Sequence, residues 1–342
     1  MRKYFILISF PLLLFCGCAE KEIKNSAVIM GTIWDVTIVD KNEAKAKKAT
    51  DEIFDEIRRI EKVMSLRKPD SELSVLNSKA GTGPVKVSDD ILNVMKIAVE
   101  LSKMSNGCFD VSIGPVVKLW GFAGGKERVP SEEEIKQAHS LVGYKLIKID
   151  PEKKEISLLK KGMLVDLGGI AKGYALDSCR KILKKHNISN IMISAGGQIY
   201  ITGHNPENKL WKVGLKHPRE KDAILTILRE TNKCIATSGD YERFFISKGK
   251  LYHHIFNPFN SKPVSDTMSA TVMIDNSSYD LPSTLADGLS TAIFVMGSKE
   301  GMKLLNQVKN AEAIIVTETE KGSKITVSDG LKDKLKFMDE LK

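Results

Sequence analysis

The sequence predicts one large domain of the α+β class, and three observations support that prediction. About 315 residues follow the N-terminal segment, and no stretch rich in Pro, Gly or Ser divides them. Apolar side chains recur at the spacing of a helix in some stretches and at the spacing of a strand in others. Predicted strands dominate one long region, residues 190–274. A single unit of this length can bury a large core.

The N-terminal half is expected to mix the two kinds of element. A strand alternates apolar and polar side chains, whereas an amphipathic helix places an apolar residue at every third or fourth position. The expected elements are a strand at 28–39, a helix from Ala46 to Met64, a helix at 89–104, a hairpin of 145–150 and 154–159 joined at Pro151, and a strand at 163–167 that leads into another helix.

The C-terminal half is expected to hold most of the strands. They cover 190–194, 198–203, 212–216, 224–229, 234–238, 244–247, 251–256 and 269–274. Helices at 281–296 and 299–309 follow, and strands near 313–317 and 324–328 close the chain.

The N-terminus has the features of a secretion signal. Arg2 and Lys3 precede an apolar run over 4–15, which is too short to span a bilayer as a stable helix. The sequence Phe15-Cys16-Gly17-Cys18 that follows resembles a bacterial lipobox. Small Gly17 precedes Cys18, whereas bulky Phe15 precedes Cys16, so Cys18 is the predicted lipidation site.

Lipidation at Cys18 would divide the chain into three parts. Residues 1–17 would be a signal peptide, 18–27 a polar, lipid-anchored tether and 28–342 the folded domain. The protein is then expected in the cell envelope, anchored to a bacterial membrane and facing the periplasm or the exterior. An ordinary secretory signal or an uncleaved anchor is the alternative.

Charge and cysteine content argue against two further classes. Removing Arg2 and Lys3 lowers the formal net charge from +9 to +7, and the lysines lie among acidic residues, so we expect no nucleic-acid partner. Cys108, Cys179 and Cys234 are odd in number and widely spaced, which indicates neither a disulfide framework nor a CxxC metal site. Cys179 falls on the apolar side of its predicted helix and is expected to be buried.

Residues 166–177 run from an apolar segment through two glycines into an amphipathic helix. Gly168 and Gly169 allow the backbone to approach a ligand closely. The start of the helix attracts negative charge, and Lys172 adds a full positive charge. The pattern is typical of an anion-binding turn, although a plain structural connector has the same form.

Three other segments carry more polar or aromatic residues than packing requires. Residues 108–122 place aromatic rings and a carboxylate around a proline turn, either as a pocket for a flat ring or as a loop plugged by its own side chains. Residues 194–198 form a glycine turn, which either faces a phosphate or simply joins two strands. In 237–243, Arg243 either clamps a phosphate or pairs with the strand neighbours of Glu242.

Two histidines stand together at the end of a predicted strand. Neighbouring residues of a strand point to opposite sides, so only one of His253 and His254 can face a given site. One is expected to be structural, and the other is a candidate general base because imidazole titrates near neutral pH. A metal site made by both is disfavoured.

Asp287 and Thr291 lie four residues apart on the predicted helix 281–296, away from its apolar stripe. A carboxylate and a hydroxyl oxygen suit Mg²⁺, a hard ion that keeps phosphate and water among its ligands. The same pair on an exposed helix surface would have no such role.

Taken in order, these segments resemble the bacterial ApbE family of flavin transferases. The resemblance spans residues 28 to about 330, and it rests on eight blocks in the family's order: Met30-Gly31-Thr32, Ser71 to Asn77, Phe109 to Gly121, Asp166 to Tyr174, Ala195-Gly196-Gly197, Thr237-Ser238-Gly239, His253-His254-Ile255, and Ala286-Asp287 with Ser290-Thr291. It implies an extensive, largely antiparallel sheet with flanking helices. Two positions depart from the pattern: Asn257 stands where many members have Asp, and Gln198 where Asp or Asn follows the two glycines.

The resemblance also implies a role for individual residues. His254 matches the histidine that activates the acceptor hydroxyl. The metal ligands would be the carbonyl of Gly169 and the side chains of Asp287 and Thr291. The positions that match the FAD site are Met30, Leu66, Cys108, Phe109, Asp110, Asp166, Lys172 and Ile255.

The implied activity is transfer of FMN from FAD to a threonine hydroxyl of an acceptor flavoprotein, through a phosphoester bond and with release of AMP. Mg²⁺ is the implied cofactor, and a subunit of a membrane redox pump is one kind of acceptor. Hydrolysis of FAD to FMN and AMP by the same metal site is one alternative. A non-enzymatic flavin-binding lipoprotein is another, although storage alone has no need of a metal.

Overall fold

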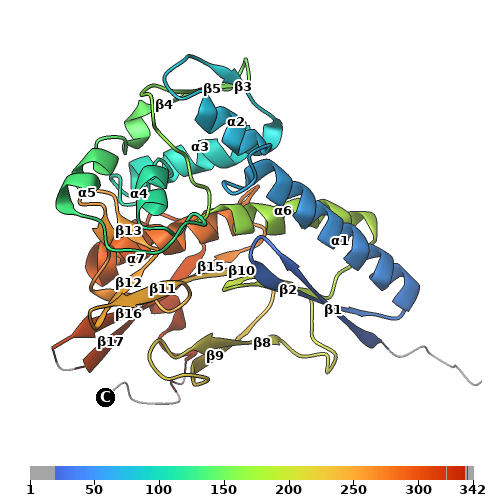
Figure 1. Cartoon of the computed structure of the whole chain (residues 1–342). Helices are drawn as coiled ribbons and strands as arrows, with labels where there is room; N and C mark the ends of the chain where they lie inside the picture. Colours follow the sequence, from blue (N-terminus) through green and yellow to red (C-terminus); the bar gives the residue numbers. More distant parts are fainter. Residues whose placement is uncertain (1–19, 321, 336, 338–342) are drawn as a thin grey trace, which may run out of the picture.

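The computed structural model describes residues 20–320, 322–335 and 337, and an eight-stranded antiparallel sheet forms its centre (Figure 1). The strands lie in the order β1-β2-β6-β7-β10-β15-β16-β17. Their bounds are Lys21–Ile29 (β1), Thr32–Asp40 (β2), Ile191–Ala195 (β6), Gln198–Thr202 (β7), Lys233–Gly239 (β10), Thr267–Asp275 (β15), Ala311–Thr319 (β16) and Gly322–Val327 (β17). The α+β prediction, with a largely antiparallel sheet and flanking helices, is confirmed.

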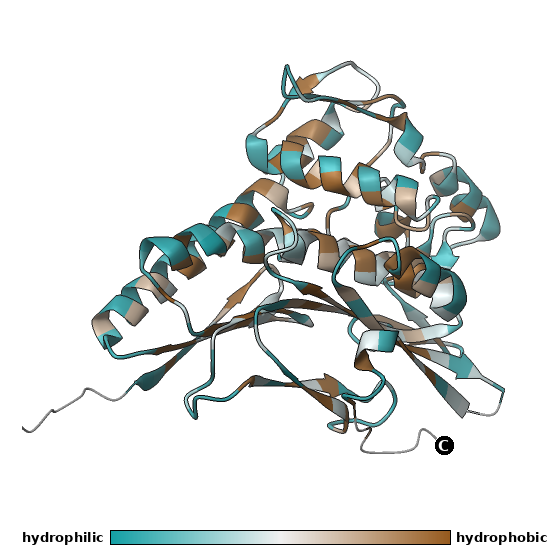
Figure 2. Ribbon diagram, turned by 180° about the vertical axis from the view of Figure 1, so that it is seen from behind, coloured by the Kyte–Doolittle hydropathy of each residue, from teal (hydrophilic) through white to brown (hydrophobic). Residues whose placement is uncertain are grey.

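Both faces of the sheet are covered. Helices α1 (Glu43–Met64), α6 (Ala171–Lys185) and α7 (Pro282–Leu305) cover one face, and the hairpin of β8 (Trp211–Lys216) and β9 (Ile224–Glu230) covers the other (Figures 1 and 2). The helices share a continuous apolar core with the sheet. The β8–β9 hairpin packs on a second core made with sheet residues such as Ile201, Ile235 and Ile314.

A smaller layer of helices and short strands lies beyond the three long helices (Figure 1). It contains α2 (Glu72–Ser78), α3 (Asp89–Met104), α4 (Gly114–Leu119), α5 (Glu132–His139), the 3-10 turn η1 (Tyr144–Leu146) and the sheet β3-β5-β4 (Val85–Lys86, Glu155–Leu158, Ile147–Asp150). Two hairpins, β11–β12 (Phe244–Ser247, Lys250–His253) and β13–β14 (Phe256–Asn257, Lys262–Pro263), complete the described elements with η2 (Asp329–Leu331).

Most predicted elements are present, and the helix at 89–104 has exactly the predicted bounds. Cys179 is fully buried, as its place in the helix predicts. The predicted strand at 251–256 is interrupted, because β12 ends at His253 and β13 begins at Phe256. The two predicted helices 281–296 and 299–309 form one element, α7, that kinks at Gly297 (φ 74°, ψ 177°) and ends at Leu305.

The predicted strand at 28–39 is two strands joined by a tight turn. Met30 (φ 51°) and Gly31 (φ 73°) adopt the left-handed conformation that closes a two-residue hairpin. Apolar Met30 continues the alternation of the predicted strand, so the sequence pattern did not indicate the turn. Strand β1 begins at Lys21 and therefore takes up most of the expected tether 18–27.

The predicted strand at 163–167 is wrong. Only Leu164 forms an isolated parallel bridge, with Ile113. The side chain of Asn77 takes the place of a neighbouring strand, because it accepts from Val165 N (2.7 Å) and donates to Val165 O (2.9 Å). Asp166 N donates to Val111 O at 2.8 Å. Just before the glycine turn, hydrogen bonds from the Asn77 side chain thus take the place of the backbone hydrogen bonds that a paired strand would make.

No helix among the described residues is long and apolar enough to cross a membrane.

Candidate active site

One cavity of about 460 Å³ gathers the described candidate residues. The turn between β1 and β2 contributes Met30, and the segments after α1, α3 and β12 contribute Leu66, residues 108–110 and residues 254–255. Asp166, Gly169 and Lys172 come from the glycine turn and the start of α6, and Asp287 and Thr291 come from α7. Cys18, the predicted lipidation site, lies outside the described residues.

The glycine turn holds its own charged side chains in place. Asp166 Oδ1 accepts from Gly168 N at 2.8 Å, and Lys172 Nζ donates to Gly168 O at 3.3 Å. Burial raises the pKa of the Asp166 carboxyl, and this rise is opposed by the Gly168 hydrogen bond and by nearby cations. Helix α6 begins at Ala171 without a side-chain cap, and its first amides bond within the protein: Ala171 N donates to Leu167 O (2.8 Å) and Gly173 N donates to Asp287 Oδ2 (2.9 Å).

Asp287 and Thr291 place two kinds of oxygen at the cavity wall. Asp287 is only 1% exposed, and its carboxylate accepts from Gly173 N and from Gln198 Nε2, both at 2.9 Å. Burial raises the pKa of Asp287, whereas the charge of Lys172 lowers it. Thr291 Oγ1 lies 3.1 Å from Ser238 Oγ. A Cβ on Gly169 would stand 3.3 Å from Thr291 Oγ1, so the backbone of the glycine turn adjoins this oxygen.

These residues fit a Mg²⁺ ion whose other ligands come from a substrate. The donors are a carboxylate, a hydroxyl and a neighbouring backbone segment, which are the hard oxygen ligands that Mg²⁺ prefers. Among the described residues, no three His, Cys, Asp or Glu side chains gather into a metal cluster. Gln198 Oε1, on the amide that donates to Asp287, is buried without a hydrogen-bond partner in the described part of the chain. The site therefore supplies oxygen ligands for Mg²⁺ but does not surround the ion with protein atoms.

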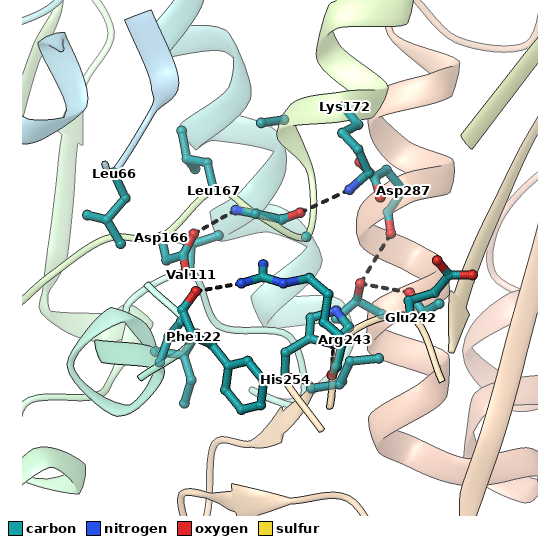
Figure 3. Close-up of a pocket in the computed structure, with 18 of the residues that line it drawn as sticks. Leu66, Val111, Phe122, Asp166, Leu167, Lys172, Glu242, Arg243, His254 and Asp287 are labelled. Carbon is teal, nitrogen blue, oxygen red and sulfur yellow. Dashed lines mark hydrogen bonds between the residues drawn. The ribbon is translucent and has the colours of Figure 1, made fainter. Parts of the chain in front are cut away.

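Only His254 of the two histidines lines the cavity (Figure 3). His253 is buried, and its ring uses both nitrogens: Nδ1 accepts from Ile255 N (3.2 Å), and Nε2 donates to Val264 O (2.7 Å). The Nδ1 of His254 lies 3.1 Å from Arg243 O. A carbonyl oxygen only accepts, so Nδ1 carries the proton and Nε2 of the neutral ring keeps a free lone pair.

The environment of His254 keeps its ring neutral. Enclosure in the cavity, and then the positive charge of Arg243, lower the pKa of His254 to about 3. The ring is therefore an imidazole at neutral pH, in the form that can accept a proton.

The segment 108–110 forms a structured wall of the cavity. Phe109 is 4% exposed and packs into the main core. The carboxylate of Asp110 accepts from Ser112 N (2.8 Å), Ser112 Oγ (2.6 Å) and Tyr144 N (2.8 Å), so its side chain stabilises the loop. Burial raises the pKa values of both Asp110 and Cys108.

The sequence missed Arg67 and left Arg243 undecided. Both line the cavity, and both donate to Phe122 O, at 3.4 Å from Arg67 and 2.5 Å from Arg243. Glu242, the residue before Arg243, forms an ion pair with Lys216 (3.7 Å). Arg67 directly follows Leu66 in the sequence, but nothing in the pattern of that loop marked its side chain for the cavity.

Fold and cavity together define an α+β protein that brings a glycine turn with a lysine, hard oxygen donors and a neutral imidazole into one site. The model of the ApbE family matches residues 30–315, and the chain belongs to this family.

Solved and curated relatives agree with this assignment. The chain is similar to "FAD:protein FMN transferase" of Vibrio cholerae, with 30% identity over 339 residues that cover 97% of this chain and 98% of the relative. The protein of the same name from Haemophilus influenzae is 31% identical, with 90% of each chain covered. The crystal structure of the ApbE protein from Thermotoga maritima superposes with a TM-score of 0.81 at 31% identity and covers 91% of this chain and 98% of that one.

Proposed function

We propose that this chain is a FAD:protein FMN transferase. It transfers FMN from FAD to a threonine hydroxyl of an acceptor protein, with Mg²⁺, and releases AMP. One observation carries the proposal: the cavity brings His254, with its free Nε2, together with Gly169, Asp287 and Thr291. Family membership and the printed names of the relatives support the flavin substrate.

In this mechanism His254 accepts the proton of the acceptor hydroxyl. The carbonyl of Arg243 holds Nδ1–H, so Nε2 is the ring atom that would accept the proton. The threonine oxygen forms a bond to the FMN-side phosphorus. The bond from that phosphorus to the bridging oxygen breaks, and AMP leaves with the electron pair.

Other residues bind and orient the diphosphate. Asp287, Thr291 and the Gly169 carbonyl would hold Mg²⁺, which supplies charge neutralisation for the diphosphate and its leaving group. Gly173 N and Gln198 Nε2 fix the orientation of the Asp287 carboxylate. Lys172 and the N-terminal end of α6 add positive potential on the same side.

The test combines the protein with FAD, Mg²⁺ and a candidate acceptor domain. Flavin fluorescence that stays on the acceptor after denaturation, with an equal amount of AMP, is the expected result. AMP with free FMN and no labelled protein across several acceptors would instead establish FAD hydrolysis. Bound, unchanged FAD would establish a flavin carrier.

We also propose that Cys18 carries a lipid and anchors the enzyme in the cell envelope. The support is the sequence Phe15-Cys16-Gly17-Cys18 after a short apolar run. Mass spectrometry of the N-terminal peptide from membranes should find diacylglycerol on Cys18, and Cys18→Ser should release the protein from the membrane. Lipid on Cys16, or an unmodified N-terminus, would contradict the assignment.

A further inference from the structure

Two arginines from distant parts of the chain meet at one carbonyl in the cavity. Arg67 follows α1 and Arg243 precedes β11, yet both guanidinium groups donate to Phe122 O. Arg243 also lies over the Phe122 ring, with its Cζ 5.9 Å from the ring centroid. Phe122 is 2% exposed and packs in an aromatic cluster with Trp120 and Phe256, so its carbonyl is a fixed anchor.

The positive charges of this pair are not compensated by an ion pair. Within the described part of the chain, neither guanidinium forms an ion pair with a carboxylate, although exposed arginines such as Arg59 and Arg128 do. Asp166 is near enough to influence Arg243, but its Oδ1 is engaged by Gly168 N. Burial and the like charge of Arg67 lower the pKa of Arg243, whereas the carboxylates of Asp166 and Glu127 raise it, so the repulsion between the two cations is only partly offset.

An anion in the cavity would relieve this repulsion. A guanidinium has five N–H donors, and each of these two uses one of them on Phe122 O, so most donors stay available. Planar, forked donors suit phosphate oxygens and bind them through charge-assisted hydrogen bonds. Figure 3 shows Arg243 reaching across the cavity between Phe122 and Asp166, with His254 beside it.

We propose that Arg67 and Arg243 form a phosphate clamp for the FMN half of the substrate. The inference rests on the proposed function, because it assigns the clamp to the phosphate that is transferred. The backbone carbonyl of Arg243 orients His254 while its side chain would bind the phosphate, so one residue would align the base with its target. The clamp lies on segments separate from the oxygens of Asp287 and Thr291.

The experiment compares flavins that differ only in the phosphate. Fluorescence titrations would measure the affinity of the wild type, Arg243→Gln and Arg67→Gln for riboflavin, FMN and FAD. We expect each variant to bind FMN and FAD about tenfold to a hundredfold more weakly, which is typical of a lost charged hydrogen bond, with riboflavin binding unchanged. Arg243→Lys, which keeps the charge and loses the fork, should give a smaller loss.

Two controls keep the test decisive. Arg128→Gln removes an exposed arginine whose partner is Glu134, and it should bind all three flavins like the wild type. Arg67 is exposed, so Arg67→Gln remains informative even if Arg243→Gln destabilises the protein. A parallel loss of riboflavin affinity would place the arginines on the flavin ring, and unchanged FMN affinity would make them structural. Either result overturns the clamp, and neither depends on whether covalent transfer occurs.

Discussion

Asp177 and Asp287 are both buried carboxylates on the helix pair α6–α7, but they have different surroundings. Asp177, 4% exposed, accepts from Ser283 N (3.1 Å), Thr284 N (2.8 Å) and Thr284 Oγ1 (2.7 Å) and so holds the start of α7. Asp287 accepts from two donors and borders the cavity. The donors to Asp177 all come from the start of α7, so its role is structural, whereas Asp287 lines the cavity that holds the other candidate residues and can bind a ligand there.

The two neighbouring histidines repeat this difference. His253 uses both ring nitrogens inside the protein, whereas His254 uses one. A ring nitrogen left without a protein partner, rather than residue type, distinguishes the candidate base from the structural histidine.

Asp287→Ala should abolish turnover. The variant removes the one carboxylate of the proposed metal site, so the loss should be about a thousandfold or more. AMP release would be measured together with Mn²⁺ binding by electron paramagnetic resonance, and both should be lost in a folded protein. Unchanged activity would refute the ligand assignment.

His254→Ala should lower kcat by about a hundredfold to ten-thousandfold, the range for loss of a general base. FAD affinity should be retained, because the proposed role is proton transfer. His253→Ala is the comparison: it should lower the melting temperature, since it leaves Val264 O and Ile255 N without their partner. If His254→Ala lost FAD binding, the residue would belong to the binding pocket.

Gly173→Ala should disturb the contact between α6 and the first two turns of α7. A Cβ at this position would collide with Ser283 O and stand 2.8 Å from Asp287 Cβ. Moving the helices apart should cost about 1–3 kcal/mol of stability and weaken the Gly173 N–H bond to Asp287, with a moderate loss of turnover. Gly125→Ala, which has only ordinary contacts, is the control. Wild-type melting and turnover in Gly173→Ala would contradict the tight packing.

Asp177→Asn should leave turnover nearly unchanged and alter the pH dependence of stability. Burial raises the pKa of Asp177 from 3.8 to about 6, so the folded state favours the protonated acid. That contribution is complete below about pH 4 and is lost as the pH rises through 6, and it amounts to roughly 3 kcal/mol at most. Thermal denaturation from pH 4 to 7 should therefore have a flatter pH dependence in Asp177→Asn. Equal slopes would show that Asp177 does not titrate in this range.

The sequence predicted the regular elements well, because helix and strand periodicities are local. The described candidate residues that the family resemblance pointed to all line one cavity, and their roles stay predictions. It failed where tertiary contacts decide the backbone: Asn77 replaces a strand partner at Val165, and Met30 bends a chain whose alternation continues through it. Arg67 was missed because its role depends on Phe122 O, a carbonyl 55 positions away.

If Cys18 carries the proposed lipid, the early start of β1 limits where the enzyme can work. With the proposed lipid on Cys18, only Ala19 and Glu20 precede Lys21, the first residue of the sheet. Such a link spans about 10 Å at full extension, so the sheet would stay at the lipid surface. Enzyme and acceptor would then meet by lateral diffusion in two dimensions, which favours acceptors that are themselves in the membrane over freely diffusing ones.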